Sequence, residues 1–148
     1  MLNHNAILVL GAGQLGMSVL RHLAPYAERV PGVAVSVLLR PSNSSSADAA
    51  KQQKLADLSA LGIDIVAGDL ATQSSAELAA IFSRFDTVIS CTGFIGGPGV
   101  QRKIARAALD AGVKRFVPWQ FGVDYDVIGR GSPQDPFDEQ LDAVSYTH

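Results

Sequence analysis

The stretch ILVLGAGQLG, residues 7–16, decides the fold. Four apolar residues run directly into Gly11, Gly13 and Gly16, and apolar residues at helical spacing follow. The glycine spacing, G-x-G-x-x-G, is weak evidence by itself, because the chain contains 14 glycines. The surrounding sequence therefore has to decide between a phosphate-binding turn and a tight turn that only joins a strand to a helix.

Segments typical of strands and of helices alternate along the chain. Short apolar runs predict buried parallel strands, and these are residues 6–10, 33–39, 63–67, 87–91 and 113–118. Apolar residues at helical spacing predict helices, and these are residues 17–23, 47–61, 76–82 and 100–111. Pro25 and the Pro31-Gly32 pair are expected to mark the end of the first helix. The alternation predicts an α/β fold, a doubly wound parallel sheet of the Rossmann type with strand order 3-2-1-4-5.

Composition and charge narrow the class of protein. The chain has 47% hydrophobic and 18% charged residues, which is typical of a globular domain. A net charge of −2 offers no basic face, so we expect no nucleic-acid partner. The first residues contain no apolar run of signal or membrane length, so no membrane partner is expected. The single cysteine, Cys91, fits a reducing compartment, and we expect a cytoplasmic location.

The opening glycines have the context that a dinucleotide-binding turn needs, since they follow a predicted strand and precede a predicted helix. Gly11 permits the tight turn, Gly13 lets the backbone approach a pyrophosphate, and Gly16 lets the helix pack against the strand. Gln14 and Leu15 would line the turn. The free N–H groups at the start of the helix would face the anion. The alternative is a tight turn that binds no ligand.

The end of the second predicted strand favours NADP(H). Sites for the unphosphorylated cofactor usually have a carboxylate here, which accepts hydrogen bonds from the ribose hydroxyls. This chain has Arg40 instead, followed shortly by Ser42. A guanidinium can bind a 2′-phosphate through charge-assisted hydrogen bonds, each contributing about 1.5–3 kcal/mol. A surface arginine at the end of a strand is the alternative.

The remaining strand ends supply further candidates. Asp69 follows the third strand, where an adenine would lie, although an Asx-type turn explains it nearly as well. Thr92, Gly93 and Phe94 follow the fourth strand and are expected to contact the nicotinamide half. Cys91 is expected to be a small buried hydrophobic residue rather than a reactive thiol. No two histidines have metal-ligand spacing, so no metal site is expected.

The run AGVKRFVPWQFGVDYD, residues 111–126, resembles the fifth-strand signature of the NmrA-like and isoflavone-reductase-like proteins. These are atypical members of the short-chain dehydrogenase/reductase superfamily. GAGQLG, VLLRPS, VAGDL and DTVISCTG occur in the order and at the distances of that family. The resemblance implies an NADPH-dependent reductase that transfers hydride to a small aromatic or phenolic acceptor. The alternative that the resemblance implies is a cofactor-sensing regulator without chemistry.

Two departures from the family concern the reacting end of the cofactor. The family commonly reads P-S-E-F-G where this chain has PWQFG, so that Trp119, Gln120 and Phe121 would surround this end. Trp119 would stack on the nicotinamide or on an aromatic substrate, or else pack under the loop. Gln140 occupies the position of the family lysine that acts in proton transfer. Glutamine cannot donate or accept this proton, so the resemblance leaves the catalytic residue unknown.

A third departure concerns length. The relatives continue with a sixth strand and a helical substrate-binding region, whereas this chain ends at AVSYTH. We therefore expect a Rossmann domain at residues 1–122, a loosely ordered and incomplete C-terminal extension at residues 123–148, and a substrate-binding half that is largely absent. The uncovered edge of the sheet is expected to be available to a partner or to a second copy as a homodimer. A truncated remnant that binds no ligand is the remaining alternative.

Overall fold

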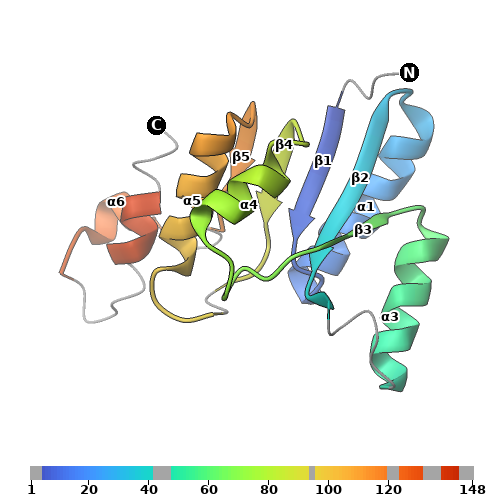
Figure 1. The fold of residues 1–148 in the computed structure, drawn as a ribbon, viewed down its shortest axis with the longest axis horizontal. Coiled ribbons are helices and arrows are strands. Elements are labelled where there is room, and N and C mark those ends of the chain that lie inside the picture. Colours follow the sequence, from blue (N-terminus) through green and yellow to red (C-terminus); the bar gives the residue numbers. More distant parts are fainter. Residues whose placement is uncertain (1–4, 42–47, 94–95, 120–123, 132–137, 144–148) are drawn as a thin grey trace.

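The computed structural model describes residues 5–41, 48–93, 96–119, 124–131 and 138–143. Its five strands are β1 (Asn5–Leu10), β2 (Val33–Leu39), β3 (Asp64–Ala67), β4 (Thr87–Ser90) and β5 (Arg115–Val117). They form one parallel sheet in the order β3-β2-β1-β4-β5 (Figure 1). This confirms the predicted doubly wound order. Because β1 pairs with both β2 and β4, the order reverses beside β1.

The helices cover both faces of the sheet. They are α1 (Gln14–Arg29), α3 (Ala49–Ala60), α4 (Ser75–Phe82), α5 (Val100–Ala111) and α6 (Tyr125–Ile128). Helices α1 and α3 pack on one face, whereas α4 and α5 pack on the other. A further helical segment at residues 138–143 follows α6 (Figure 1). Within the described ranges, no helix is both long enough and apolar enough to cross a bilayer.

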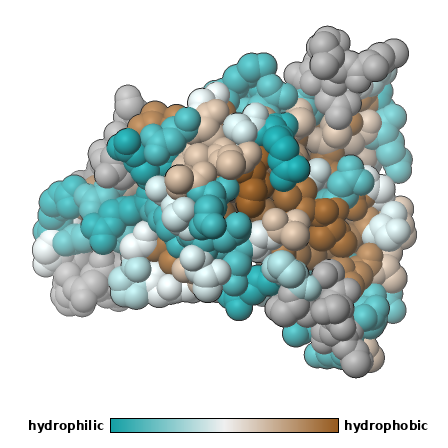
Figure 2. Space-filling view, in the orientation of Figure 1, coloured by the Kyte–Doolittle hydropathy of each residue, from teal (hydrophilic) through white to brown (hydrophobic). Residues whose placement is uncertain are grey.

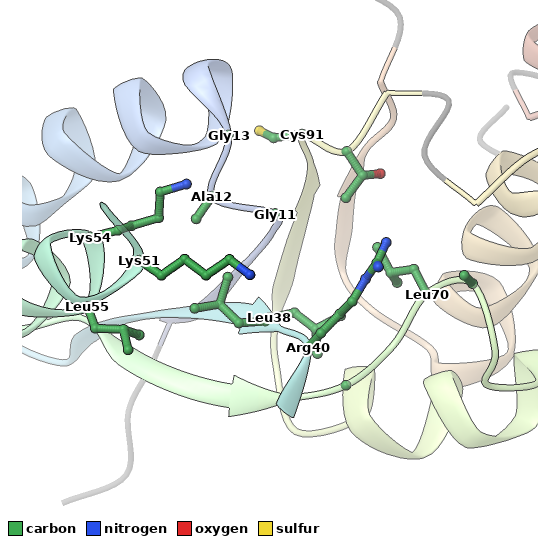
Figure 3. A pocket seen from close by; sticks show the side chains of 14 residues that line it. Gly11, Ala12, Gly13, Leu38, Arg40, Lys51, Lys54, Leu55, Leu70 and Cys91 are labelled. Atoms are coloured by element: carbon green, nitrogen blue, oxygen red, sulfur yellow. The ribbon is translucent and has the colours of Figure 1, made fainter. Parts of the chain in front are cut away.

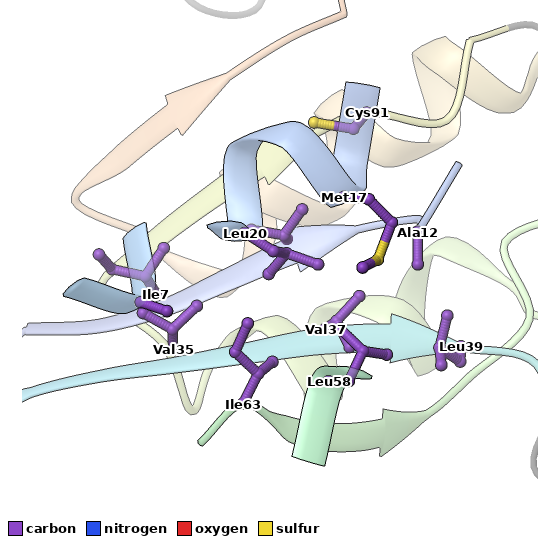
Figure 4. Packing of buried hydrophobic residues seen from close by; sticks show 12 residues of the cluster. Ile7, Ala12, Met17, Leu20, Val35, Val37, Leu39, Leu58, Ile63 and Cys91 are labelled. Carbon is purple, nitrogen blue, oxygen red and sulfur yellow. The ribbon is translucent and has the colours of Figure 1, made fainter. Parts of the chain in front are cut away.

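The side chains of β1 explain why it lies at the centre. Ile7 and Val9 join the cluster beneath α1 and α3 (Figure 4), whereas Leu8 and Leu10 join the cluster beneath α4 and α5. All four are at most 5% exposed. Fully burying a side chain of this kind contributes roughly 1.5–3 kcal/mol. A continuous apolar run therefore gains most at the strand that is covered on both faces.

Local signals set the helix boundaries. The side chain of Asp48 accepts a hydrogen bond from the N–H of Ala50 at the start of α3 (2.9 Å). Ser74 and Glu77 form a capping box at the start of α4, with distances of 3.2 and 2.7 Å. Helix α5 ends at Gly112, whose φ of 68° is the left-handed conformation that favours glycine.

The prediction that Pro25 marks the end of the first helix is wrong. Helix α1 continues to Arg29 with Pro25 in its interior, and the Nε–H of Arg29 donates to the Pro25 carbonyl (3.2 Å). Proline removes the donor that the Arg21 carbonyl would otherwise bond. Because Arg21 and Pro25 are both exposed, water can solvate that carbonyl. The buried apolar face of α1, which includes Leu20, maintains the helix through this position.

The two edge strands expose apolar side chains. Ile65 of β3 is 42% exposed and Val117 of β5 is 39% exposed. Figure 2 shows apolar surface in the region where β2 and β3 lie in Figure 1. Among the described residues, β5 pairs with β4 alone, and an uncovered edge at β5 stays a prediction. Association of two copies through this edge stays a prediction.

Candidate cofactor-binding site

A cavity of about 260 Å³ lies at the carboxyl ends of the parallel strands (Figure 3). This is where ligands bind in open α/β sheets, beside the point at which the strand order reverses. The end of β2, four loops and helix α3 line it: Gly11, Ala12 and Gly13 after β1, Leu38 and Leu39 at the end of β2, Arg40 after β2, Lys51, Lys54 and Leu55 on α3, Gly68, Leu70 and Ala71 after β3, and Cys91 and Thr92 after β4.

The three glycines of the opening motif have different surroundings. Gly11 has a φ of 93°, which favours glycine. A Cβ on Gly16 would overlap the carbonyl oxygen of Gly11, so Gly16 allows α1 to approach the turn. A Cβ on Gly13 would meet no atom within 4 Å, and Gly13 lines the cavity. The backbone at Gly13 is therefore open to a ligand, as a pyrophosphate site requires.

The start of α1 is suited to an anion. Gly13 is the N-cap and provides no side-chain cap, and the first turn contains no acidic residue. The first helical hydrogen bond runs from the N–H of Met17 to the Gly13 carbonyl (2.9 Å). The earlier amides, including those of Gln14 and Leu15, thus have no acceptor within the helix. These amides and the helix dipole favour negative charge at the cavity.

Three cationic residues line the cavity near the end of β2. Arg40 was predicted from the sequence, but Lys51 and Lys54 of α3 were not. Figure 3 shows both lysine side chains extending from α3 toward the turn that contains Gly11 and Ala12. The sequence contained a pattern that could have indicated them, because Lys51 and Lys54 lie at helical spacing from the buried Leu58 and so share its side of α3. The acidic residues that the structure describes are absent from the cavity lining.

Two residues after β4 differ in their chemistry. Cys91 is 8% exposed, and burial raises the pKa of its thiol to about 11. The thiol is therefore protonated at neutral pH, which agrees with a small buried hydrophobic residue. The hydroxyl of Thr92 is buried and has no hydrogen-bond partner among the described residues. Because buried hydroxyls are normally paired, this atom fits a site that a polar ligand completes.

Gly93 and Trp119 lie against each other beside the cavity. Gly93 has a φ of 61°, and a Cβ built on it would lie 3.5 Å from Cζ2 of the Trp119 ring. The loop after β4 and the loop after β5 thus meet here. Stacking of Trp119 on a nicotinamide or a substrate stays a prediction. Four predicted contact residues lie outside the described part of the chain, and these are Ser42, Phe94, Gln120 and Phe121.

Asp69 forms an Asx-type turn after β3. Its carboxylate accepts from the N–H of Ala71 (2.8 Å) and of Thr72 (3.3 Å). The Ala71 hydrogen bond is the main reason that the pKa of Asp69 lies below its ordinary value. The neighbouring Leu70 lines the cavity, whereas Asp69 is outside the lining. A role of Asp69 in contacting an adenine stays a prediction.

The sequence matches the NmrA-like family over residues 3–141. The chain belongs to the NmrA-like family. It is 52% identical over 136 residues to an NmrA-like family domain-containing oxidoreductase of Gibberella moniliformis, a match that covers 91% of this chain and 44% of the relative. It is 35% identical to the phenylcoumaran benzylic ether reductase Pyrc5 of Pyrus communis, which covers 81% of this chain and 36% of the relative.

Solved structures superimpose on most of this NmrA-like chain. The structure of AtPrR2 with NADP+ and (+)pinoresinol is 27% identical and superimposes with a TM-score of 0.75, over 96% of this chain and 45% of that one. A crystal structure of isoflavone reductase is 26% identical with a TM-score of 0.74, over 95% of this chain and 44% of that one. This NmrA-like chain therefore spans less than half the length of the relatives that it matches.

Proposed function

We propose that this NmrA-like chain binds NADP(H) and forms the cofactor-binding half of an oxidoreductase. The bound cofactor would supply hydride to a small aromatic or phenolic acceptor. The observation that carries the proposal is one cavity in which the uncapped start of α1 faces Arg40, Lys51 and Lys54. The names of the similar proteins support the acceptor class, because they include reductases of phenylcoumaran benzylic ethers and a complex with pinoresinol.

The two phosphate groups of the cofactor would use different parts of the cavity. The pyrophosphate would face Gly13 and the first amides of α1, where the helix dipole adds about 0.3–1 kcal/mol per negative charge. The 2′-phosphate would lie near Arg40, Lys51 and Lys54, with Ser42 as a further proposed contact. Each charge-assisted hydrogen bond contributes about 1.5–3 kcal/mol. NADH lacks the 2′-phosphate, so these three cations would set the preference for NADPH.

The reacting half of the cofactor would lie at the end of β4. The unpaired hydroxyl of Thr92 would bond a polar group of the nicotinamide half, and the Gly93 backbone would pack against it. Trp119 would shield this end from water, with Phe94, Gln120 and Phe121 as further proposed contacts. The bound cofactor supplies the hydride. The chain's own residues orient it and exclude solvent.

A second candidate function is an NADP(H)-sensing regulator without turnover. The specific support is Gln140, which is fully buried and stands where the resemblance expects a proton-transferring lysine. A neutral amide cannot give up a proton at physiological pH, so it cannot act as the general acid. Both candidates share the cofactor site. They differ only in whether bound NADPH is oxidised.

The first experiment is a titration of the purified chain with NADPH and NADH, followed by nicotinamide fluorescence. Saturable NADPH binding that is at least tenfold tighter than NADH binding is expected. Binding of neither dinucleotide at millimolar concentration would reject both candidate functions and favour the ligand-free remnant. Equal affinity for the two would reject the role given to the three cations. Incubation of the NADPH complex with a panel of aromatic alkenes and carbonyls then separates the reductase from the regulator.

The location and the association of the chain are proposals as well. The free, buried Cys91 is consistent with the cytoplasm as a reducing compartment. The exposed edge at β5, where Val117 is 39% exposed, is the surface proposed for a homodimer. Sedimentation velocity over a hundredfold range of concentration tests the second point, and a monomer throughout would reject it.

A further inference from the structure

The start of α5 is capped by a residue that lies far along the chain. Gly99, the N-cap, has a φ of 90° and offers no side chain for capping. The carboxylate of Glu139 accepts hydrogen bonds from the N–H groups of Gly99 (3.0 Å), Gln101 (2.7 Å) and Arg102 (3.3 Å). Glu139 is only 8% exposed. A negative charge on these amides is favourable because it also faces the positive end of the helix dipole.

The same first turn of α5 reaches the proposed cofactor site. Gln101 is 4% exposed, and its side-chain Nε2–H donates to the carbonyl oxygen of Gly93. Gly93 directly follows Thr92 of the cavity and packs against the ring of Trp119. One residue, Gln101, thus contacts Glu139 through its main chain and Gly93 through its side chain. The contacts form a continuous path from the helical segment 138–143 to the reacting end of the site.

A second carboxylate ties the same segment to α5 at the surface, through the side chain of Arg102. Asp142 accepts from Arg102 (3.1 Å) and from Arg130 (2.6 Å). The Arg130 guanidinium is the main cause of the lowered pKa of Asp142. Both arginine side chains are at least half exposed. Asp142 therefore provides a matched comparison, since it docks the segment at the surface.

We infer that Glu139 is a positioning residue for the reacting end of the cofactor, an inference that rests on the proposed function. Its carboxylate fixes the first turn of α5, and this turn orients Gln101 on the Gly93 carbonyl. The loop at Thr92 and Gly93, and the surface on which Trp119 lies, are then held in place for the nicotinamide half. Without the carboxylate, three amides at the start of α5 lose their acceptor, and the turn that carries Gln101 becomes free to shift.

The test uses Glu139→Gln, which keeps the size of the side chain but puts an N–H₂ group where one carboxylate oxygen accepts. That group faces N–H donors and cannot bond them. The controls are Asp142→Asn, in the same segment, and Glu77→Gln, which removes a carboxylate cap from the exposed start of α4. Two quantities are measured: the Kd for NADPH, and the emission of Trp119 without cofactor, which is unambiguous because the chain has one tryptophan.

Glu139→Gln is expected to weaken NADPH binding about tenfold, equivalent to ~1.4 kcal/mol, and to shift the Trp119 emission to longer wavelength. Both controls are expected to lower the melting temperature while leaving Kd within twofold and the emission unchanged. Gln101→Met keeps the amides bonded to Glu139 and removes only the Gly93 bond. It is expected to reproduce both effects, and the double variant should add little to either single one.

The inference is overturned if Glu139→Gln leaves both the Kd and the Trp119 emission unchanged, or if the two controls change them as much. If Glu139→Gln fails to fold, Gln101→Met decides alone by the same two measurements. If the unaltered chain binds no NADPH, the proposed function fails and only the emission remains informative. An emission shift shared by Glu139→Gln and Gln101→Met then supports the path of contacts, whereas unchanged emission rejects it.

Discussion

The methyl carbon of Thr92 lies 3.0 Å from the point that a Cβ on Gly11 would occupy. The ends of β1 and β4 are therefore in close contact at the position where the strand order reverses. The turn after β1 and the loop after β4 share one wall of the cavity. Glycine at position 11, with its φ of 93°, is the condition for this contact.

Two alanine substitutions separate packing from binding in the glycine turn. Gly16→Ala places a methyl group against the Gly11 carbonyl, and we expect it to lower the free energy of unfolding by roughly 1–3 kcal/mol. Gly13→Ala meets no atom within 4 Å and is expected to unfold like the unaltered chain while binding NADPH at least tenfold more weakly. Urea unfolding and NADPH titration measure the two effects. Unchanged NADPH affinity in Gly13→Ala would show that the pyrophosphate lies elsewhere.

The cations at the end of β2 are expected to act on NADPH selectively. Arg40→Asp, Lys51→Gln and Lys54→Gln should each raise the Kd for NADPH, about tenfold for a lost charge-assisted bond and more for the charge reversal. The Kd for NADH should change less than threefold. Arg106→Gln, which removes an exposed cation on α5, is the control and should change neither. A variant that weakens NADH equally would place its cation away from the 2′-phosphate.

We expect Asp86 to make the stability of the chain depend on pH. Its carboxylate accepts from the ammonium of Lys114 (2.7 Å) and the N–H of Ala6 (2.9 Å), and these bonds, the Lys114 bond first, hold its pKa below 3.8. A lowered pKa means that the stabilisation is present above the ordinary value and is lost as pH falls through the folded value. Asp86→Asn should therefore be less stable than the unaltered chain at pH 7, with the difference shrinking toward pH 2.

Melting temperatures of both proteins between pH 7 and pH 2 test this. The control is Asp110→Asn, which removes an exposed carboxylate paired within α5 and should change the melting temperature little at any pH. A difference between Asp86→Asn and the unaltered chain that stays constant with pH would mean that the loss is one of packing, independent of the carboxylate charge.

Cys91 should be unreactive until the chain unfolds. Burial raises its pKa from an ordinary 9.0 to about 11, so at pH 8 the thiolate fraction is about a hundredfold lower in the folded chain. Alkylation of the folded protein should therefore be at least a hundredfold slower than in urea. NADPH should slow it further, because Cys91 lines the cavity. Rapid alkylation of the folded chain would contradict the buried position, and Cys91→Ala serves as the blank.

Local patterns were sufficient for the fold but only partly for the site. Apolar runs such as ILVL predicted the buried strands, since side chains of β1 enter both cores. The prediction that the helix ends at Pro25 was wrong because the Arg21 carbonyl, which loses its N–H donor, lies at an exposed position where water can solvate it. Lys51 and Lys54 could have been predicted, because they share the helical spacing of the buried Leu58. The cap by Glu139 could not, because it joins residues 37 to 40 positions apart, and no local pattern encodes such a pairing.

Because the residue that caps α5 lies far along the chain, this cap forms only after Glu139 has been synthesised. Every strand that the structure describes has been synthesised once residue 117 is added. Until Glu139 is added, the N–H groups of Gly99 and Gln101 lack the acceptor that it provides. The loop at Thr92 and Gly93, which is proposed to contact a nicotinamide, therefore gains this support only after all the described strands have been synthesised.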